Sequence, residues 1–216
     1  MLIMKKYLNK NLLSYILGMA FATIGIAFCT KANLGLSMIA ATPYIISKYF
    51  SSFAPWITQG RAEYIWNLII IIVLAIVVKK WKWSYLLAFV TSVFVGKFID
   101  LWLFIFGHEF YELMIIKVLM FCVGTFLTSL GIAFYFRTTY PCQAYELFVK
   151  EYANNYHTDI TKTKRYYDYI TLIIDVILAL LLFKGFVGVG LGTVIITILN
   201  NRIIGLCSKF LDKIHY

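Results

Sequence analysis

The chain has 216 residues, of which 62% are hydrophobic and 14% are charged, and its mean hydropathy is +0.82. Soluble domains are about 45–50% apolar and about 25% charged, so this composition excludes an ordinary soluble protein. The net charge of +10 does not indicate nucleic-acid binding, because the basic residues lie between apolar runs and form no separate basic region. Four scattered cysteines without a Cys-x-x-Cys pair predict neither a disulfide nor a metal site.

Six apolar segments are long enough to cross a hydrocarbon core of about 30 Å. They cover residues 11–29, 62–78, 84–106, 113–136, 166–183 and 186–207. Two further apolar stretches, 37–50 and 143–154, are too short to cross, and we expect interfacial or re-entrant helices there. The first segment follows Lys5, Lys6 and Lys10, as the core of a secretory signal would. It is longer than such a core and recurs later in the chain, so we assign it to the fold.

A sequence repeat divides the chain into two halves. Residues 25–28, Gly-Ile-Ala-Phe, recur as residues 131–134, and Gly18 recurs as Gly124 at the same spacing of 106 residues. An internal repeat of this kind indicates that one structural unit occurs twice.

Both copies continue into a basic residue and then a helix breaker. The corresponding pairs are Lys31 with Arg137, Gly35 with Pro141 and, at a spacing of 105 residues, Lys97 with Arg202. Each half contains three spans, an odd number, so the second half enters the membrane in the opposite orientation. We therefore predict an all-α membrane protein of six transmembrane helices. Its two inverted three-helix repeats are residues 1–106 and 107–216, each with a short helix after its first span.

The distribution of basic residues predicts the orientation. Fourteen lysines and arginines, Lys164 among them, lie in segments on the side of the N-terminus, against four on the other side. Cytoplasmic loops carry an excess of lysine and arginine. We therefore expect both termini and the loops at 79–83 and 137–165 to be cytoplasmic.

Ionisable residues inside a span are costly and are functional candidates by default. Asp175 lies in the middle of the fifth apolar segment. Its two alternative roles are an ion pair with a basic residue and a substrate or proton site. Lys97 and Asp100 share a helix face, as a local ion pair or as part of a site. Lys31 and Arg137 flank the helix breaks. Their two alternative roles are solvated charges at the membrane interface and binding of a ligand.

The two short helices would present free N–H groups and positive dipole ends to an anion. We therefore hypothesise a polar cavity between the halves that receives a small anionic solute, with Ser37 capping the first short helix. Asp100 and Asp175 would balance charge or carry a coupling proton. The candidate substrate-binding residues are Lys31, Asn33, Ser37, Lys97, Asp100, Arg137, Gln143, Asp175, Thr193 and Arg202.

Four glycines precede Thr193 near the start of the sixth segment: Gly185, Gly188, Gly190 and Gly192. No strand precedes them and they lack the spacing Gly-x-x-x-x-Gly-Lys-Ser/Thr, so they do not indicate a nucleotide-binding loop. We expect them to allow close helix packing or an unwound start of the helix. The sequence shows no nucleophile–base arrangement and no cluster of metal ligands. We therefore expect no enzymatic activity, no cofactor and no metal.

These motifs resemble the YczE/YyaS/YitT group of bacterial integral membrane proteins over nearly the whole chain. Lys31-Ala32-Asn33-Leu34-Gly35-x-Ser37 is similar to the first signature of that group, and Gly96-x-x-Ile99-Asp100 to its third-span signature. Asp168 and Gly188-Val189-x-x-Gly192-Thr193 follow in the family order. The chain departs from the pattern at Met38, Gln143, Gly190-Leu191 and Asn201, which replace a proline, an acidic residue, an often charged pair and a glycine. The resemblance implies a small multi-span protein of the bacterial plasma membrane, and it implies no substrate.

Transport of a small solute is the leading functional prediction, because broken helices and buried charges at repeat-related positions are typical of secondary transporters. The alternative is a non-transporting accessory or regulatory subunit of another membrane complex. A chain of 216 residues is small for a complete transporter. We therefore expect a homodimer or a partner membrane protein, with the lipid bilayer as its surroundings.

Overall fold

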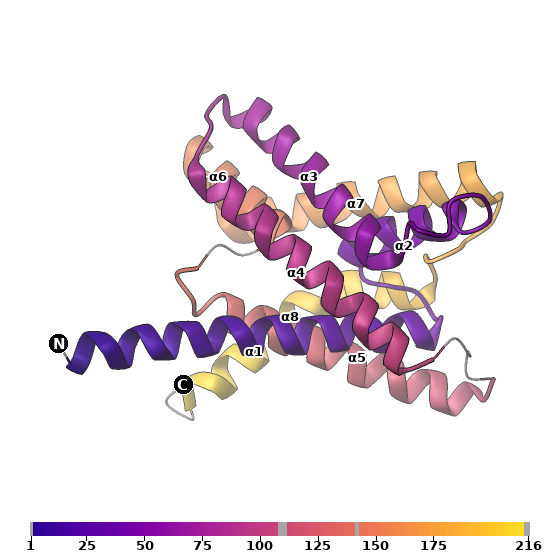
Figure 1. Cartoon of the computed structure of the whole chain (residues 1–216), viewed down its shortest axis with the longest axis horizontal. Coiled ribbons are helices and arrows are strands. Elements are labelled where there is room, and N and C mark those ends of the chain that lie inside the picture. The colour runs from indigo at the N-terminus through magenta and orange to yellow at the C-terminus, as the bar shows by residue number, and fades with distance from the viewer. Residues whose placement is uncertain (1, 108–111, 141–142, 214–216) are drawn as a thin grey trace.

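A computed structural model describes the backbone of residues 2–107, 112–140 and 143–213, and their side chains from Lys10 onward. These residues form eight α-helices and no strand (Figure 1). The helices are α1 (Leu2–Ala32), α2 (Met38–Phe50), α3 (Gln59–Val78), α4 (Trp83–Ile105), α5 (Met114–Tyr135), α6 (Ala144–Tyr156), α7 (Ile160–Phe183) and α8 (Leu191–Lys213). The predicted all-α class is confirmed. Pro141, the predicted breaker of the second half, lies outside the described residues.

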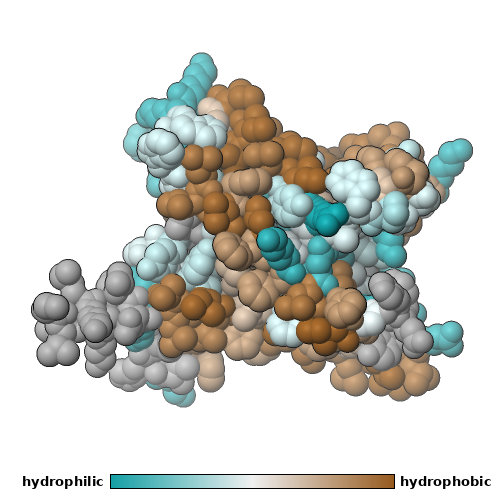
Figure 2. Space-filling view, viewed as in Figure 1, coloured by the Kyte–Doolittle hydropathy of each residue, from teal (hydrophilic) through white to brown (hydrophobic). Residues whose placement is uncertain are grey.

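Six helices are long and apolar enough to cross a membrane: α1, α3, α4, α5, α7 and α8. Their candidate spans have 20 to 24 residues, which at about 1.5 Å per residue corresponds to about 30–36 Å. The helices α2 and α6 have 13 residues each and reach only about 20 Å. Figure 2 shows mainly apolar surface over α3 and α4, with hydrophilic residues at the tip beyond α3. The chain is therefore a multi-pass membrane protein.

Two helix starts differ from the predicted segments. The helix α7 begins six residues before the predicted segment, because the Asp159 carboxylate caps it by accepting a hydrogen bond from the N–H of Lys162 at 2.8 Å. Lys164, which the sequence placed in a cytoplasmic loop, therefore lies within a helix and is buried. The helix α8 begins five residues later than predicted. The glycine-rich segment before it is unwound, with Gly188 at φ +75°.

The helices α1 and α5 pack against each other through glycines. A methyl group added at Gly131 would lie 2.7 Å from the carbonyl oxygen of Gly18, and one added at Gly25 would lie 2.6 Å from that of Gly124. The two backbones therefore touch, which small residues allow in membrane helix pairs. Because the higher-numbered glycine of α1 meets the lower-numbered glycine of α5, the two helices run antiparallel.

The other helices are arranged around this pair. The helix α4 packs against α1, and α8 packs against α5. The short helices α2 and α6 each pack against both α3 and α7. In Figure 1 the helix α6 lies at the end of the molecule that carries both termini, and α2 lies toward the opposite end. The helices α3 and α7 are thus held between a short helix toward each end.

The break after α1 lies against the break before α8. The N–H of Leu36 donates to the carbonyl oxygen of Gly188 at 3.1 Å, and the N–H of Gly192 donates to that of Leu34 at 3.0 Å. Gly35 has φ +117°, and a methyl group there would lie 2.7 Å from the backbone nitrogen of Thr193. The two glycine-containing motifs at opposite ends of the sequence therefore form one junction, in which their unwound backbones satisfy each other's hydrogen bonds.

The glycine contacts of α1 and α5 predict a selective loss of stability. In Gly131→Ala the new methyl group meets backbone atoms on Gly18 and Ala22 that cannot turn aside. We expect a loss of about 1–3 kcal/mol in the free energy of unfolding, as for an overpacked core. Thermal unfolding of the purified protein in detergent measures it.

Gly205→Ala is the matched control, because Gly205 is also helical and a methyl group there meets nothing within 4 Å. We expect that variant to be as stable as the parent protein or slightly more stable. Equal unfolding temperatures for Gly131→Ala and the parent would contradict the packing described.

Candidate functional site

The helix α3 carries a buried polar stripe. Gln59, Glu63 and Asn67 follow one another at four-residue intervals and so share one helix face. Their exposed fractions are 6%, 1% and 1%, although most of the other side chains of α3 are apolar. Polar and charged side chains inside a membrane span are rare and face the interior of a helix bundle. The stripe therefore marks the inward face of α3.

The helix α7 carries a second buried polar stripe. Lys164, Asp168, Thr171 and Asp175 recur at intervals of four, three and four residues, which again places them on one helix face. Their exposed fractions are 8%, 1%, 6% and 0%. The interior of the bundle thus contains three charged groups from one helix, and burying a charge is costly unless it is paired or neutralised.

Two acidic residues meet where α3 packs against α6. Asn67 donates a hydrogen bond to Glu63 Oε1 at 3.1 Å, while Glu63 Oε2 has no hydrogen-bond partner among the described residues. Glu146, in the first turn of α6, interacts electrostatically with Glu63, and its Oε2 atom likewise lacks a partner in the described part of the chain. Burial raises the pKa of Glu146 above the usual carboxyl value, against the opposing effects of a backbone N–H and of Lys164 and Lys150.

A third acidic residue is better paired. Tyr145 of α6 donates its hydroxyl hydrogen to Asp168 Oδ1. Lys164 Nζ lies 3.7 Å from Asp168 Oδ2 and 3.3 Å from the Tyr145 hydroxyl. We call Glu63, Glu146, Asp168, Lys164 and Tyr145 the carboxylate cluster. It contains three acids and one lysine, so full ionisation would leave an excess of negative charge in the interior.

Asp175 lies apart from this cluster, on the side of α7 that packs against α2. It is fully buried, and the Thr42 hydroxyl donates a hydrogen bond to its Oδ1 atom. Among the described residues its Oδ2 atom has no hydrogen-bond partner, and no lysine or arginine forms an ion pair with it. The helix pair α2–α7 therefore holds a carboxyl group through a hydroxyl and without an ion pair.

A cavity of about 440 Å³ lies between α1, α2, α3 and the end of α4. Its charged lining residues are Lys31, Lys48 and Asp100, and we call it the lysine cavity. Lys31 is only 4% exposed, and its Nζ atom donates to the carbonyl oxygen of Gly107. The cavity also reaches Gln59, the first residue of the α3 stripe.

Asp100 holds the start of α3 against α4. Its Oδ2 atom accepts a hydrogen bond from the Thr58 hydroxyl at 2.6 Å, and its Oδ1 atom accepts one from the N–H of Gly60 at 2.8 Å. Lys97 forms no ion pair with Asp100 within the described ranges, although the two residues are one turn apart. Asp100 thus contributes a negative group to the lysine cavity that is already satisfied by two donors.

The junction of the two chain breaks contains three of the predicted site residues. Asn33 is exposed and has left-handed φ of +52°, which ends α1. Ser37 occupies the N-cap position of α2 but makes no capping hydrogen bond, so the predicted cap is wrong. It instead lines a pocket of about 10 Å³, near the size of one water molecule, with Asn200 and Thr125. Thr193 is fully buried, and its hydroxyl accepts a hydrogen bond from the N–H of Gly190 at 3.1 Å.

The remaining predicted basic residues lie away from the lysine cavity. Arg137 donates hydrogen bonds to the carbonyl oxygen of Ser208 at 2.6 Å and to Asp212, which ties the end of α5 to the last turns of α8. Lys97 and Arg202 are exposed. The structure therefore does not bring the four repeat-related cations to one cavity. Gln143 is buried at the N-cap of α6 and makes no capping hydrogen bond.

All five residues of the carboxylate cluster were missing from the predicted site: Glu63, Glu146, Lys164, Asp168 and Tyr145. The four charged residues lie within four residues of a boundary of a predicted apolar segment, where a charge is typical of an interface. The repeat contained the missing signal, because Gln59 and Glu63 correspond to Lys164 and Asp168 at the spacing of 105 residues. A polar pair that recurs at the repeat spacing is better explained by the interior of a fold than by two loops.

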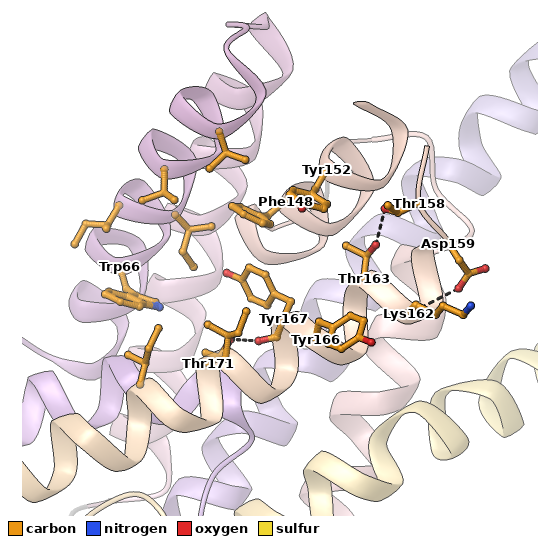
Figure 3. Close-up of a pocket in the computed structure, with 16 residues that line it drawn as sticks. Trp66, Phe148, Tyr152, Thr158, Asp159, Lys162, Thr163, Tyr166, Tyr167 and Thr171 are labelled. Atoms are coloured by element: carbon orange, nitrogen blue, oxygen red, sulfur yellow. Dashed lines mark hydrogen bonds between the residues drawn. The ribbon is translucent and has the colours of Figure 1, made fainter. Parts of the chain in front are cut away.

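An apolar groove of about 820 Å³ opens between α3, α6 and α7 (Figure 3). Its walls include Trp66 of α3, Phe148 of α6 and Tyr166 of α7, and its polar residues gather at the end near Lys162. Tyr167 also lines it, with its ring 4.9 Å from that of Phe148 and 4.8 Å from that of Tyr145. Tyr167 thus connects the wall of the groove to Tyr145 of the carboxylate cluster.

The ion pair of the carboxylate cluster predicts a penalty for removing the lysine alone. Lys164→Met would leave Asp168 buried without its cation, and we expect a loss of about 3–5 kcal/mol in the free energy of unfolding. The double variant Lys164→Met/Asp168→Asn should recover much of that loss, since no uncompensated charge remains at that position. Chemical denaturation in detergent measures both. The exposed Lys162 on the same helix gives the control Lys162→Met, and equal losses for the two lysines would contradict the assignment.

Comparisons with known proteins identify the family of the chain. The family of unknown function DUF6198 matches residues 9–209. The uncharacterized protein YyaS of Bacillus subtilis (strain 168) is 27% identical over 204 residues, which cover 92% of each chain. No solved structure matches the chain significantly. The resemblance to the YyaS type, based on the sequence motifs, is thus confirmed. The chain belongs to the DUF6198 family.

Proposed function

We propose that the protein is a transporter of a small solute, built as two inverted repeats. The observation that carries this proposal is the pair of buried polar stripes on α3 and α7. Gln59 and Glu63 of one stripe correspond to Lys164 and Asp168 of the other at a spacing of 105 residues. Buried polar residues on repeat-related helices form the solute and ion sites of secondary transporters.

Three further features support the inverted repeat. The helices α2 and α6 have 13 residues each and begin 106 residues apart. The C-caps of α3 and α7 are Lys79 and Lys184, 105 residues apart, and both have left-handed backbone conformations. The antiparallel contact of α1 with α5 has the same symmetry. Exchanging each glycine for its repeat counterpart converts the contact of Gly18 with Gly131 into that of Gly124 with Gly25.

The lysine cavity is the proposed receiving site for the solute. A volume of about 440 Å³ lies within the range of small-molecule sites. Two lysines and one acid give its charged lining a net positive charge, and the Asp100 carboxylate is already occupied by two donors. This balance favours a small anion such as a carboxylate or phosphate. Gln59 joins the cavity to the α3 stripe, so the stripe is the proposed route toward the interior.

The basic residues support the proposed orientation, because their excess on the side of the N-terminus favours cytoplasmic termini. The similarity to a bacterial relative favours the bacterial plasma membrane. The alternative function, a non-transporting accessory subunit, is favoured by the apolar groove of α3, α6 and α7, which offers a surface for a partner within the membrane. Uptake of a bound solute by liposomes that contain only this protein would separate the two functions.

The anion site predicts a ligand effect that depends on one lysine. We expect a member of a panel of small carboxylates, phosphate and sulfate to raise the unfolding temperature of the purified protein. Lys31→Gln should remove a charge-assisted contact of about 1.5–3 kcal/mol, which weakens binding roughly tenfold or more. Lys97→Gln is the matched control, because Lys97 is exposed and lies outside the cavity. Retention of the ligand effect in Lys31→Gln would contradict this site.

The orientation predicts opposite accessibility of two loops. Single cysteines at Ser52 and Lys80, both exposed, are introduced into a variant without the native cysteines. In intact cells a membrane-impermeant maleimide should label the cysteine at position 52 and not that at position 80, since the latter faces the cytoplasm. Labelling of both positions from outside would refute the topology. Labelling of both after the cells are opened confirms that each site is reactive.

A further inference from the structure

We propose that Glu63 and Glu146 form a proton-binding site, in which the two carboxyl groups hold one exchangeable proton between them. The ligand is a hydrogen ion taken up from water, and no other reactant is involved. The site needs no solute, so its existence does not depend on the proposed transport function. If the protein does transport a solute, this proton is the coupling ion.

The first argument is the absence of donors for two ionised carboxylates. Glu63 is 1% exposed and Glu146 is 4% exposed. Each has one oxygen, Oε2, without a hydrogen-bond partner among the described residues. An ionised carboxylate needs several donors to offset its lost hydration, whereas a protonated carboxyl group supplies a donor of its own. One shared proton therefore gives a hydrogen-bond donor to an oxygen that would have none if both groups were ionised.

The second argument is the local balance of charge. Glu63 and Glu146 interact electrostatically across the contact of α3 with α6. Like charges in a buried site cannot both remain ionised at low cost, so the first proton binds tightly. The one buried cation of the cluster, Lys164, lies 3.7 Å from Asp168 and so already has an acidic partner. The cluster therefore has no second buried cation to neutralise the two ionised carboxylates of the pair.

Every helix packed against the pair adds a limited set of charged groups. From α7, Lys164 and Tyr167 interact electrostatically with Glu146, and Asp168 is paired with Lys164. The helix α6 itself adds Lys150. From α4, Tyr85 packs with Ala144 in the same apolar cluster, while Lys97 is exposed and Asp100 is bound to Thr58 and Gly60. The one charged residue of α2, Lys48, lines the lysine cavity. Lys164 and Lys150 thus oppose protonation of Glu146, and burial outweighs them.

The apolar groove gives a lipid-soluble reagent a route toward the site. Tyr167 lines the groove and interacts electrostatically with Glu146. Figure 3 shows its ring beside Phe148, on the side of the groove formed by α6 and α7. Dicyclohexylcarbodiimide is such a reagent, and it reacts with protonated carboxyl groups in apolar surroundings. It therefore reports the proton without any solute.

The test treats the purified full-length protein in liposomes with this carbodiimide and locates the adducts by peptide mass spectrometry. We expect at most one adduct for each chain on the pair, on Glu63 or Glu146. Its rate should fall about tenfold for each pH unit above the titration midpoint, because the protonated fraction falls in that proportion. The double variant Glu63→Gln/Glu146→Gln should form no adduct at these positions. Glu151→Gln is the matched control on α6, since Glu151 pairs with Lys82 outside the site, and its adduct yield should be unchanged.

Three results would overturn the site: no adduct on either residue at low pH, a rate independent of pH, or an adduct on Asp175 alone. None of these requires a variant to fold, because all are read from the parent protein. They are also independent of the anion-binding assay. If the parent protein forms no adduct but is still stabilised by the ligand, only the proton site is refuted. If it forms the adduct but is not stabilised by any ligand, only the anion site is refuted.

The stability of the protein provides a second measurement. A raised pKa for Glu146 means that the folded state keeps a proton that the unfolded state releases above the ordinary carboxyl pKa of 4.5. This contribution to stability is complete below that pH and is lost as the pH rises through the folded-state pKa. We expect the unfolding temperature to fall with rising pH in the parent protein and to fall less steeply in Glu146→Gln. An identical pH profile for the two proteins would contradict the proposal.

Discussion

The lack of hydrogen-bonding partners in a hydrocarbon core governs this structure. A bilayer satisfies neither a backbone amide nor a carboxylate, so each must find its partner within the protein. Six long helices meet this requirement for the backbone. At the junction before α8, where the helices are interrupted, Leu36 and Gly192 donate to carbonyl oxygens of the opposite unwound segment. The unwound segments are therefore tolerated because they meet each other.

Under the same constraint, the charged side chains differ in the hydrogen-bond and ion-pair partners that they have within the protein. Arg137 reaches Ser208 and Asp212 at the end of α8 and becomes a tie between helices. Asp100 reaches two donors at the start of α3. Glu63 and Glu146 interact electrostatically and find too few donors, and in the proposed site a shared proton reduces their charge. Groups with incomplete pairing are the functional candidates, because complete pairing fixes a group in one state.

The sequence predicted the class of fold, the six spans and the two short helices, because length and hydropathy set these features. It also placed the break at Asn33 and Gly35, whose left-handed backbones follow from residue type. Which charges meet was harder to predict. Helical periodicity shows that Lys97 and Asp100 share a face, but only the packing of α3 on α4 shows that Asp100 turns to Thr58 and Gly60. The start of α7 was set too late because Lys162, Lys164 and Arg165 interrupt its hydropathy.

The two halves differ in how closely their second and third spans pack. In the first half Gly60 and Gly96 let α3 and α4 touch, since a methyl group at Gly60 would lie 1.9 Å from the carbonyl oxygen of Gly96. At the spacing of 105 residues their counterparts are Arg165 and Asn201. These larger side chains exclude a backbone contact of that kind, and α7 makes far fewer contacts with α8 than α3 makes with α4. The repeat thus holds α3 firmly and leaves α7, which carries Lys164 and Asp168, the less constrained of the two polar helices. Motion of α7 against α3 would change the surroundings of Glu146 of α6, which interacts electrostatically with Glu63 of α3 and with Lys164 of α7.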